Sequence, residues 1–347
     1  MSEHRIFFRE TVERILADAL DKADIDAAEE RILPARLYEA LNENGIPLML
    51  VSEDKGGIGA TVADAAAILR AMGEASAPGP ILETMLGQQL LASVGLEFSP
   101  GLISLVFVDG IDVPELGATE WSNATVHAVP WGAAADHVLI VARTAAGTQL
   151  IVTNGADWTA TPERDAAGEP RDNLSARSLP VTVIALANGD AYLRAAAVLR
   201  AAQCLGAIEW AFRRSVEYTG ERKQFGREIG KFQAIQQMLA ELAGHVLACV
   251  GLVEAAAEGM NPQLIAAARS RLGDAIDATI TITHQVHGAM GFSLEYSLNS
   301  RTRRLMAWRD DFGSTLYWRR MLAREFTHLQ RDEFWPAVAD SGLAAVG

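Results

Sequence analysis

The sequence predicts a mostly α-helical protein with a small β domain in its middle. Apolar residues recur at helical spacing over residues 1–100, and long Ala- and Leu-rich amphipathic segments return over residues 189–331. Between them, short β-branched runs are separated by Gly, Asp, Asn and Pro over residues 101–188. We therefore expect an N-terminal helical domain (1–100), a middle β domain (101–188), a C-terminal four-helix bundle (189–331) and a tail (332–347).

The N-terminal region predicts four helices. Residues 11–24 place apolar side chains at i, i+3 and i+4 on one face. Residues 34–44 begin with a proline and are followed by Gly45, which is typical of a helix start and stop. Paired glycines predict a turn at residues 52–57. The other two helices are expected at residues 62–75 and 80–94.

The remaining elements follow the same reasoning. Short apolar, β-branched runs predict five strands, at residues 102–108, 125–129, 137–142, 149–152 and 181–185. Amphipathic periodicity predicts four bundle helices, at residues 192–219, 229–258, 262–289 and 312–330. The tail after Asp332, which carries Pro and Trp, is expected to be irregular.

Composition excludes several classes of function. The formal net charge of −14 argues against a nucleic-acid partner, although a few arginines suffice to bind a pyrophosphate locally. Cys204 and Cys249 lie in apolar helical stretches, which favours buried thiols over a disulfide, and no Cys/His spacing suits a metal. The N-terminus has no signal-peptide pattern, and no apolar run approaches the ~18 residues needed to span a bilayer, so we expect a cytoplasmic protein.

The run Arg222-Lys223-Gln224-Phe225-Gly226 ends one predicted helix and begins a turn. An arginine suits a diphosphate because its planar fork bonds two oxygens, and the phenylalanine can pack against a ring system. The alternative is a solvated helix end, where an arginine favours the negative end of the dipole. The segment Phe232-Gln233-Ala234-Ile235, which follows closely, favours the binding interpretation.

A second motif, Gln285-Val286-His287-Gly288-Ala289-Met290-Gly291-Phe292, closes the third long helix. Its glycines permit close approach of the backbone to a ligand and free N–H groups for phosphate or adenine-ribose contacts. The alternative is a glycine helix cap, and one segment can serve both purposes. We interpret His284 and His287 as structural rather than catalytic.

Together these segments resemble the flavin-binding half of the acyl-CoA dehydrogenase family. The resemblance is strong over residues 200–330, moderate over 30–95 and weak in the β domain. It implies a fold of N-terminal helices, a middle β domain and a C-terminal four-helix bundle, with FAD shared between subunits and an acyl-CoA as substrate. It implies that Arg222 and Phe225 meet the diphosphate side, and that Gln233 also meets FAD across the interface. Gln285, Gly288 and Ala289 would line the adenosine end.

The sequence departs from that family where a carboxylate usually removes the substrate's α-proton. Phe312 occupies the usual base position, and an alternative position used by some members falls at Ala196. Asp311 is beside the usual position, as a candidate base or as a capping or solvated acid. The middle domain also lacks recognisable counterparts of the segments that pack on the flavin ring.

These departures leave three hypotheses. The chain resembles the shorter, base-lacking subunit of heteromeric bacterial acyl-CoA dehydrogenases that degrade steroid side chains, in which an unlike partner supplies the base. Alternatively, it is a self-sufficient homomeric enzyme that uses Asp311 or another carboxylate. In the third hypothesis it is a flavin-free structural partner of a catalytic subunit. The resemblance implies a homo- or hetero-oligomer, and an electron-transferring flavoprotein as acceptor.

Overall fold

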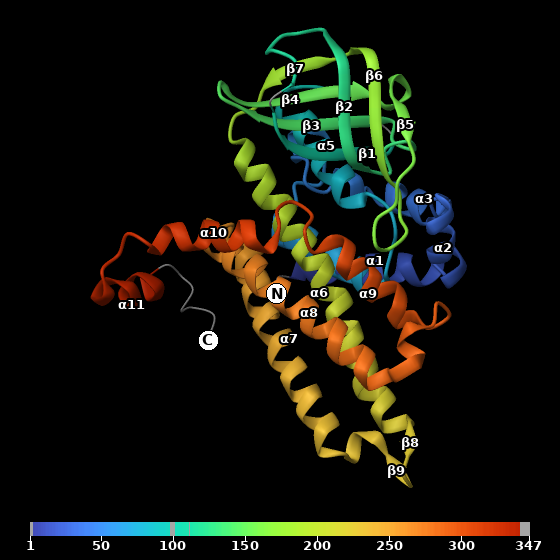
Figure 1. Ribbon diagram of the computed structural model, residues 1–347. Coiled ribbons are helices and arrows are strands. Elements are labelled where there is room, and N and C mark those ends of the chain that lie inside the picture. The colour runs from blue at the N-terminus through green and yellow to red at the C-terminus, as the bar shows by residue number, and fades with distance from the viewer. Residues whose placement is uncertain (1–2, 98–100, 111, 341–347) are drawn as a thin grey trace. The chain divides into compact units, whose positions relative to one another are not determined.

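The computed structural model describes residues 3–97, 101–110 and 112–340 (Figure 1). These residues form two compact units. The first consists of the described residues within 1–10, 62–76 and 197–347, and the second of those within 11–61 and 77–196. Helices surround a central block of strands in the sequence, so the predicted mostly α fold class with a small β region is confirmed.

Strands β1 to β7 form two sheets within the second unit. Their bounds are β1 (Ile103–Asp109), β2 (Glu120–Pro130), β3 (His137–Thr144), β4 (Gly147–Asn154), β5 (Thr159–Thr161), β6 (Arg171–Pro180) and β7 (Thr182–Ala185). One sheet has the order β1-β3-β4-β7, with β1 parallel to β3, and the other has the order β2-β6-β5. A shared apolar core, which includes Val138, Ile151 and Leu174, packs between them.

The helices before the sheets are α1 (Glu3–Ala19), α2 (Lys22–Ala27), α3 (Ala35–Glu43), α4 (Val62–Ala75) and α5 (Ile81–Ser93). After the sheets come α6 (Gly189–Glu221), α7 (Gln233–Gly259), α8 (Pro262–His287), α9 (Ser297–Trp308), α10 (Thr315–Phe326) and α11 (Arg331–Asp340). Between α6 and α7, the short strands β8 (Lys223–Gln224) and β9 (Arg227–Glu228) form a hairpin. Helix α8 packs against both α7 and α10.

Several predicted elements need correction. The first helix starts earlier than residue 11 and ends at Ala19, because Asp21 begins a new helix with a capping box to Asp24. Strand β6 was missed because polar residues dominate its sequence, and β2 supplies its pairing partner. The short β5, which pairs with β6, was also missed.

The C-terminal helices also differ from the prediction. The predicted helix 312–330 begins later, as α10, and a separate α9 precedes it, because the turn at residues 309–314 interrupts the helical path. The tail was expected to be irregular, but residues 331–340 form α11, with Asp332 and Glu333 in the first turn where the helix dipole favours acids. The rest of the tail lies outside the described residues.

Helix α7 is the described helix that bears on the expectation that no apolar run approaches the length of a membrane span. By length and composition alone it qualifies, because its most apolar window has a mean hydropathy of 1.6. A core helix of a water-soluble protein passes the same test, so this is weak evidence for a membrane span. Only 22% of that window is buried in the described chain, and Leu247 is 71% exposed. Helix α7 therefore has an apolar surface that the described chain does not cover.

Two glycines set the close packing of α4 on α6 within the first unit. A Cβ atom at Gly73 would lie 1.8 Å from the carbonyl oxygen of Gln203, and one at Gly206 would lie 1.8 Å from that of Arg70. Neither position accommodates a side chain unless the backbones separate. The two glycines therefore fix how closely these helices approach each other.

Candidate functional site

A hollow of about 540 Å³ lies at the end of the bundle that carries the β8–β9 hairpin. We call it the hairpin hollow. It is lined by Tyr218, Arg222, Gln224, Phe225, Ile229, Phe232, Ala234, Ile235 and residues 285–290. The structure thus brings together two motifs that are about sixty residues apart in the sequence. Five of the six predicted cofactor-binding residues, Arg222, Phe225, Gln285, Gly288 and Ala289, line this one concavity.

The backbone fixes Arg222 at the point where α6 ends. Its N–H donates to the carbonyl of Tyr218 at 2.9 Å, and its own carbonyl accepts from the N–H of Ile229 at 2.9 Å. The guanidinium makes no ion pair with any residue that the structure describes. A positioned arginine with an uncommitted guanidinium suits a phosphate or diphosphate, which it can bind through two parallel hydrogen bonds.

Phe225 and Gly226 form the two-residue loop of the hairpin, since Gln224 pairs directly with Arg227. Both loop residues have positive φ, 51° and 78°, as a type I′ turn requires. A phenylalanine is rare in this conformation. The side chain is nevertheless 90% exposed, and its ring meets Phe232 edge to face with centroids 6.1 Å apart. The turn therefore holds a large aromatic ring in solvent beside the hollow.

The turn after α8 forms the opposite wall. Gly288 has φ 58° and ψ −141°, a conformation essentially restricted to glycine, and a Cβ there would meet nothing within 4 Å. The backbone at Gly288 therefore faces open space that a ligand can approach closely. Gln285, Gly288 and Ala289 also line a second hollow of about 570 Å³ against α9, so this turn separates two concavities.

Two buried histidines support the same turn. The ring of His287 stacks on Tyr218 with centroids 4.4 Å apart, and its Nδ1 donates to the carbonyl of Thr283 at 2.8 Å. His284 Nε2 lies 3.0 Å from the hydroxyl of Thr302, and its ring packs on Phe292. Burial lowers the pKa of both histidines. These contacts are structural, which agrees with the interpretation from sequence.

The lowered histidine pKa values predict a pH dependence of stability. The unfolded chain takes up protons at these histidines near their ordinary pKa of about 6.5, whereas the folded chain resists them. Stability should therefore be full above about pH 6.5 and fall as the pH drops below it. His287→Phe, which keeps the aromatic stacking, should flatten the decline in Tm between about pH 7.5 and pH 5. His328→Phe, at an exposed position, is the control, and an equal slope in both variants would contradict the assignment.

Gln233 is the predicted cofactor-binding residue that lines neither hollow. It begins α7 and is exposed, while the next residue, Ala234, does line the hairpin hollow. A contact of Gln233 with FAD of a neighbouring subunit stays a prediction.

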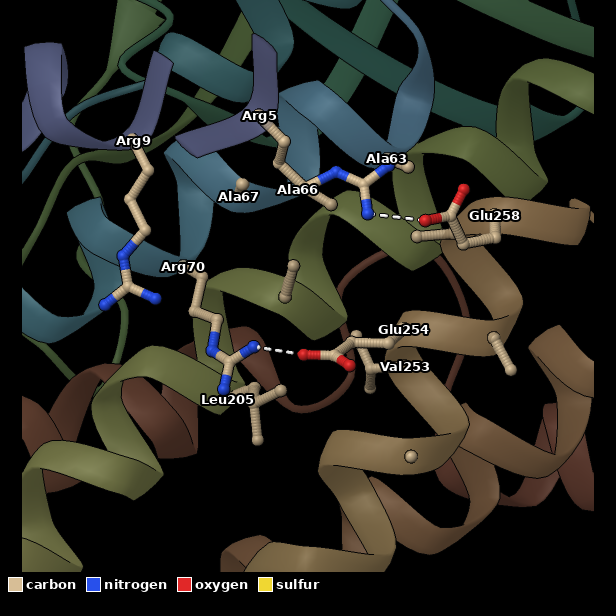
Figure 2. A pocket seen from close by; sticks show the side chains of 14 residues that line it. Arg5, Arg9, Ala63, Ala66, Ala67, Arg70, Leu205, Val253, Glu254 and Glu258 are labelled. Carbon is tan, nitrogen blue, oxygen red and sulfur yellow. Dashed lines mark hydrogen bonds and ion pairs between the residues drawn. The ribbon is translucent and has the colours of Figure 1, made fainter. Parts of the chain in front are cut away.

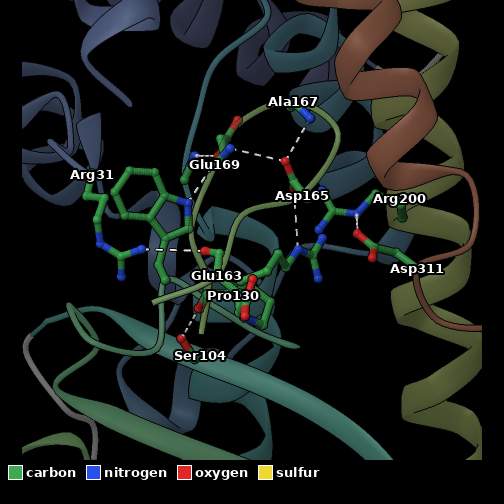
Figure 3. A network of polar contacts seen from close by, with 12 residues as sticks. Arg31, Ser104, Pro130, Glu163, Asp165, Ala167, Glu169, Arg200 and Asp311 are labelled. Carbon is green, nitrogen blue, oxygen red and sulfur yellow. Dashed lines mark hydrogen bonds and ion pairs between the residues drawn. The ribbon is translucent and has the colours of Figure 1, made fainter. Parts of the chain in front are cut away.

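Asp311, the candidate base, is held by a residue that sequence reasoning missed. Its Oδ2 lies 3.2 Å from Nε of Arg200, and the two side chains are 14% and 4% exposed (Figure 3). The guanidinium also lies over the rings of Trp308 and Phe312, at 5.5 and 5.6 Å from their centroids. The sequence did contain a signal for this pair: Arg200 is a lone arginine inside the apolar run of α6, and a buried charge needs a partner.

A second buried arginine fixes the backbone of the same turn. Nη2 of Arg269 donates to the carbonyls of Arg309, Asp311 and Gly313 at 3.0, 2.7 and 3.0 Å. Phe312 sits between them with φ 58°, the left-handed conformation that side chains rarely adopt. The turn that carries the usual base position is thus held from α8 by hydrogen bonds from the Arg269 side chain to main-chain carbonyls.

Neither the alternative base position nor the two cysteines offers a group suited to accept the substrate's proton. Ala196 is fully buried on α6 and has no ionisable group. Cys204 and Cys249 are buried free thiols, and burial raises the pKa of each to about 12. Among the described residues, no group of three or more His, Cys, Asp or Glu side chains is arranged to hold a metal ion.

Comparisons with known proteins agree with this architecture. The sequence model of the acyl-CoA dehydrogenase N-terminal domain matches residues 2–97, and that of the C-terminal domain matches residues 190–326. Acyl-CoA dehydrogenase IpdE2 of Mycobacterium tuberculosis is 28% identical over 86% of this chain and 89% of its own length.

Two solved structures share the fold. The ChsE4–ChsE5 complex of M. tuberculosis superposes with a TM-score of 0.83 at 20% identity, covering 95% of this chain and 99% of that one. PigA, solved with FAD and proline, superposes with a TM-score of 0.80 at 16% identity, covering 94% and 98%. The chain belongs to the acyl-CoA dehydrogenase family of FAD-dependent oxidoreductases that act on CH–CH groups.

Proposed function

We propose that this chain is the base-lacking subunit of a heteromeric acyl-CoA dehydrogenase. It would help to bind FAD and would support α,β-dehydrogenation of a bulky acyl-CoA, while an unlike partner supplies the catalytic base. The observation that carries the proposal is a contrast between two places in the chain, the hairpin hollow and the usual base position. The hairpin hollow offers Arg222 and a bare backbone at Gly288, whereas the base position holds Phe312 beside a carboxylate that Arg200 already engages.

The hairpin hollow fits the diphosphate and adenosine part of FAD. Arg222 would bond the diphosphate oxygens, Phe225 would pack on a ring, and the N–H groups near Gly288 and Ala289 would approach the adenosine end. When bound, FAD supplies the acceptor for the hydride that leaves the β-carbon. The residues of this chain then bind and orient the cofactor, and a carboxylate of the partner takes the α-proton.

Asp311 is poorly placed to act as the base. Its Oδ2 lies 3.2 Å from Nε of Arg200, whose side chain is almost fully buried, so the carboxylate would have to leave this contact to reach a substrate. The side chain is thus committed to a structural ion pair. The homomeric hypothesis, in the form that uses Asp311 rather than another carboxylate, needs this same side chain to accept a proton in every turnover.

Replacing Asp311 with Asn separates the two hypotheses. A general base contributes about 10²–10⁴-fold to rate, so the homomeric enzyme should lose at least ~100-fold in activity per bound flavin. In the heteromeric enzyme, activity per bound flavin should stay within about threefold, well below the general-base effect. Expressing activity per bound flavin corrects for any loss of folded protein. A large loss at full flavin occupancy would refute the heteromeric proposal.

The primary test is the visible absorption spectrum of the purified chain, alone and co-expressed with an acyl-CoA dehydrogenase-like partner. The proposal expects a colourless chain alone and a flavin band in the pair. A stoichiometric flavin band in the chain alone, with normal oxidation of acyl-CoA, would instead support a homomeric enzyme. If Arg222→Ala leaves the flavin content of the pair unchanged, the third hypothesis, a flavin-free structural partner, is supported.

The exposed apolar surface of α7 supports an oligomer, and an electron-transferring flavoprotein is the acceptor to test first.

A further inference from the structure

A third cavity, separate from both hollows, lies between four helices of the first unit (Figure 2). We call it the helix cavity. It has a volume of about 360 Å³, within the range of small-molecule sites, and its lining residues are not shared with either hollow. Apolar side chains and a glycine make up most of its lining: Ala63, Ala66, Ala67, Ala202, Leu205, Gly251, Val253, Ala255 and Ala257.

The sequence of α4 creates this space on one face only. Ala63, Ala66 and Ala67 stand at i, i+3 and i+4, so they share the helix face that lines the cavity. Elsewhere on α4, large residues such as Leu69 and Met72 are fully buried. The alanine face therefore leaves room for a ligand, while the rest of α4 is closely packed.

Ion pairs form the mouth of the cavity. Arg5 on α1 lies 2.5 Å from Glu258, and Arg70 on α4 lies 2.7 Å from Glu254, as the dashed lines in Figure 2 mark. Both glutamates are on α7, and their side chains are 57% and 50% exposed. These pairs bridge the helices at the surface while the apolar lining lies beneath them.

The charged residues of the cavity are paired with one another or with nearby carboxylates. Three arginines line the cavity, Arg5, Arg9 and Arg70. Each pairs with at least one carboxylate; the partners are Asp64, Glu74, Glu209, Glu254 and Glu258, of which only the last two line the cavity. Each arginine of the lining is thus already paired with a carboxylate, so none offers an uncommitted charge to an anionic ligand. An acyl-CoA, with its phosphates, does not suit this site.

We propose that the helix cavity binds a neutral, mainly hydrocarbon molecule of the size of a small fused-ring compound. The apolar lining provides the affinity through burial of apolar surface, and the ion pairs close over the ligand. This site is independent of the proposed FAD site, because no lining residue is common to the two.

The test uses two probes with the same skeleton. N-phenyl-1-naphthylamine is neutral, and anilinonaphthalene sulfonate carries one negative charge; both fluoresce more strongly in apolar surroundings. They are titrated into the full chain in the assembly in which it purifies. We expect saturable binding of the neutral probe, one per chain, and binding of the sulfonate at least about 10-fold weaker, equivalent to about 1.4 kcal/mol.

Cavity-filling variants locate the site. Ala66→Leu should weaken binding of the neutral probe at least about 10-fold without lowering Tm, because the new side chain occupies the space. If Ala66→Leu does not fold, Ala67→Leu is measured in its place, with the same expected loss of binding. Ala240→Leu makes the same substitution at an exposed position of α7 outside the cavity, and should leave binding unchanged.

A rim variant tests the charge argument. Glu258→Gln removes one carboxylate from the lining, and should strengthen binding of the sulfonate relative to that of the neutral probe. The absence of saturable binding, or binding that survives both cavity-filling variants, would overturn the proposal. If the two probes bind with equal affinity, and Glu258→Gln does not change either affinity, the assignment of a neutral ligand would be overturned.

Discussion

Replacing Arg222 with alanine is expected to weaken FAD binding by the assembled enzyme about 10- to 100-fold. A hydrogen bond to a charged group contributes ~1.5–3 kcal/mol, and ~1.4 kcal/mol corresponds to tenfold in affinity. The guanidinium has no competing ion pair in the described chain, so its interaction energy is available to a diphosphate. Flavin content per subunit pair, measured by absorbance after dialysis against a series of FAD concentrations, gives the change directly.

The matched control is Arg319→Ala. Arg319 is exposed, pairs with Asp274 at 2.5 Å on the surface, and lines neither hollow. A surface ion pair contributes at most ~1 kcal/mol to stability, and this one should not affect FAD at all. If both variants retain FAD equally well, Arg222 does not bind the cofactor, and the hairpin hollow loses its assigned role.

Replacing Arg269 with methionine is expected to lower the stability of the chain by about 3–5 kcal/mol. The methionine fills similar space but leaves three partly buried carbonyls, those of Arg309, Asp311 and Gly313, without this buried donor. Losses of this size occur when a buried polar network is broken. With ~2–4 °C per kcal/mol for a domain of this size, Tm should fall by about 6–20 °C.

Arg319→Met is the control for this experiment, since it makes the same substitution at an exposed position. Its Tm should change by no more than about 2–4 °C, because a surface pair contributes ~1 kcal/mol or less. If Arg269→Met melts at the same temperature as Arg319→Met, the three hydrogen bonds do not hold the 309–313 turn. The assignment of that turn as a rigid structural element would then be wrong.

The sequence by itself determined the fold class and most of the long elements. Helices α6, α7 and α8 could be predicted within a few residues because their apolar periodicity is sustained over many turns. The grouping of Arg222 with Gln285 was predictable only through resemblance to a family, since the two motifs are distant in sequence. Strand β6 could not be predicted from its composition, because its stability comes from pairing with β2.

Only the tertiary structure decided how the polar groups are paired. The sequence left Asp311 open as a base, but folding places Arg200, more than a hundred residues earlier, against its carboxylate. Likewise, the helix cavity depends on small residues from three separate helices, α4, α6 and α7, none of which indicates a cavity alone. Periodicity reports which face of an element is buried. The partner that a buried charge meets, and the space that small side chains leave, depend on contacts between distant segments, which local sequence does not encode.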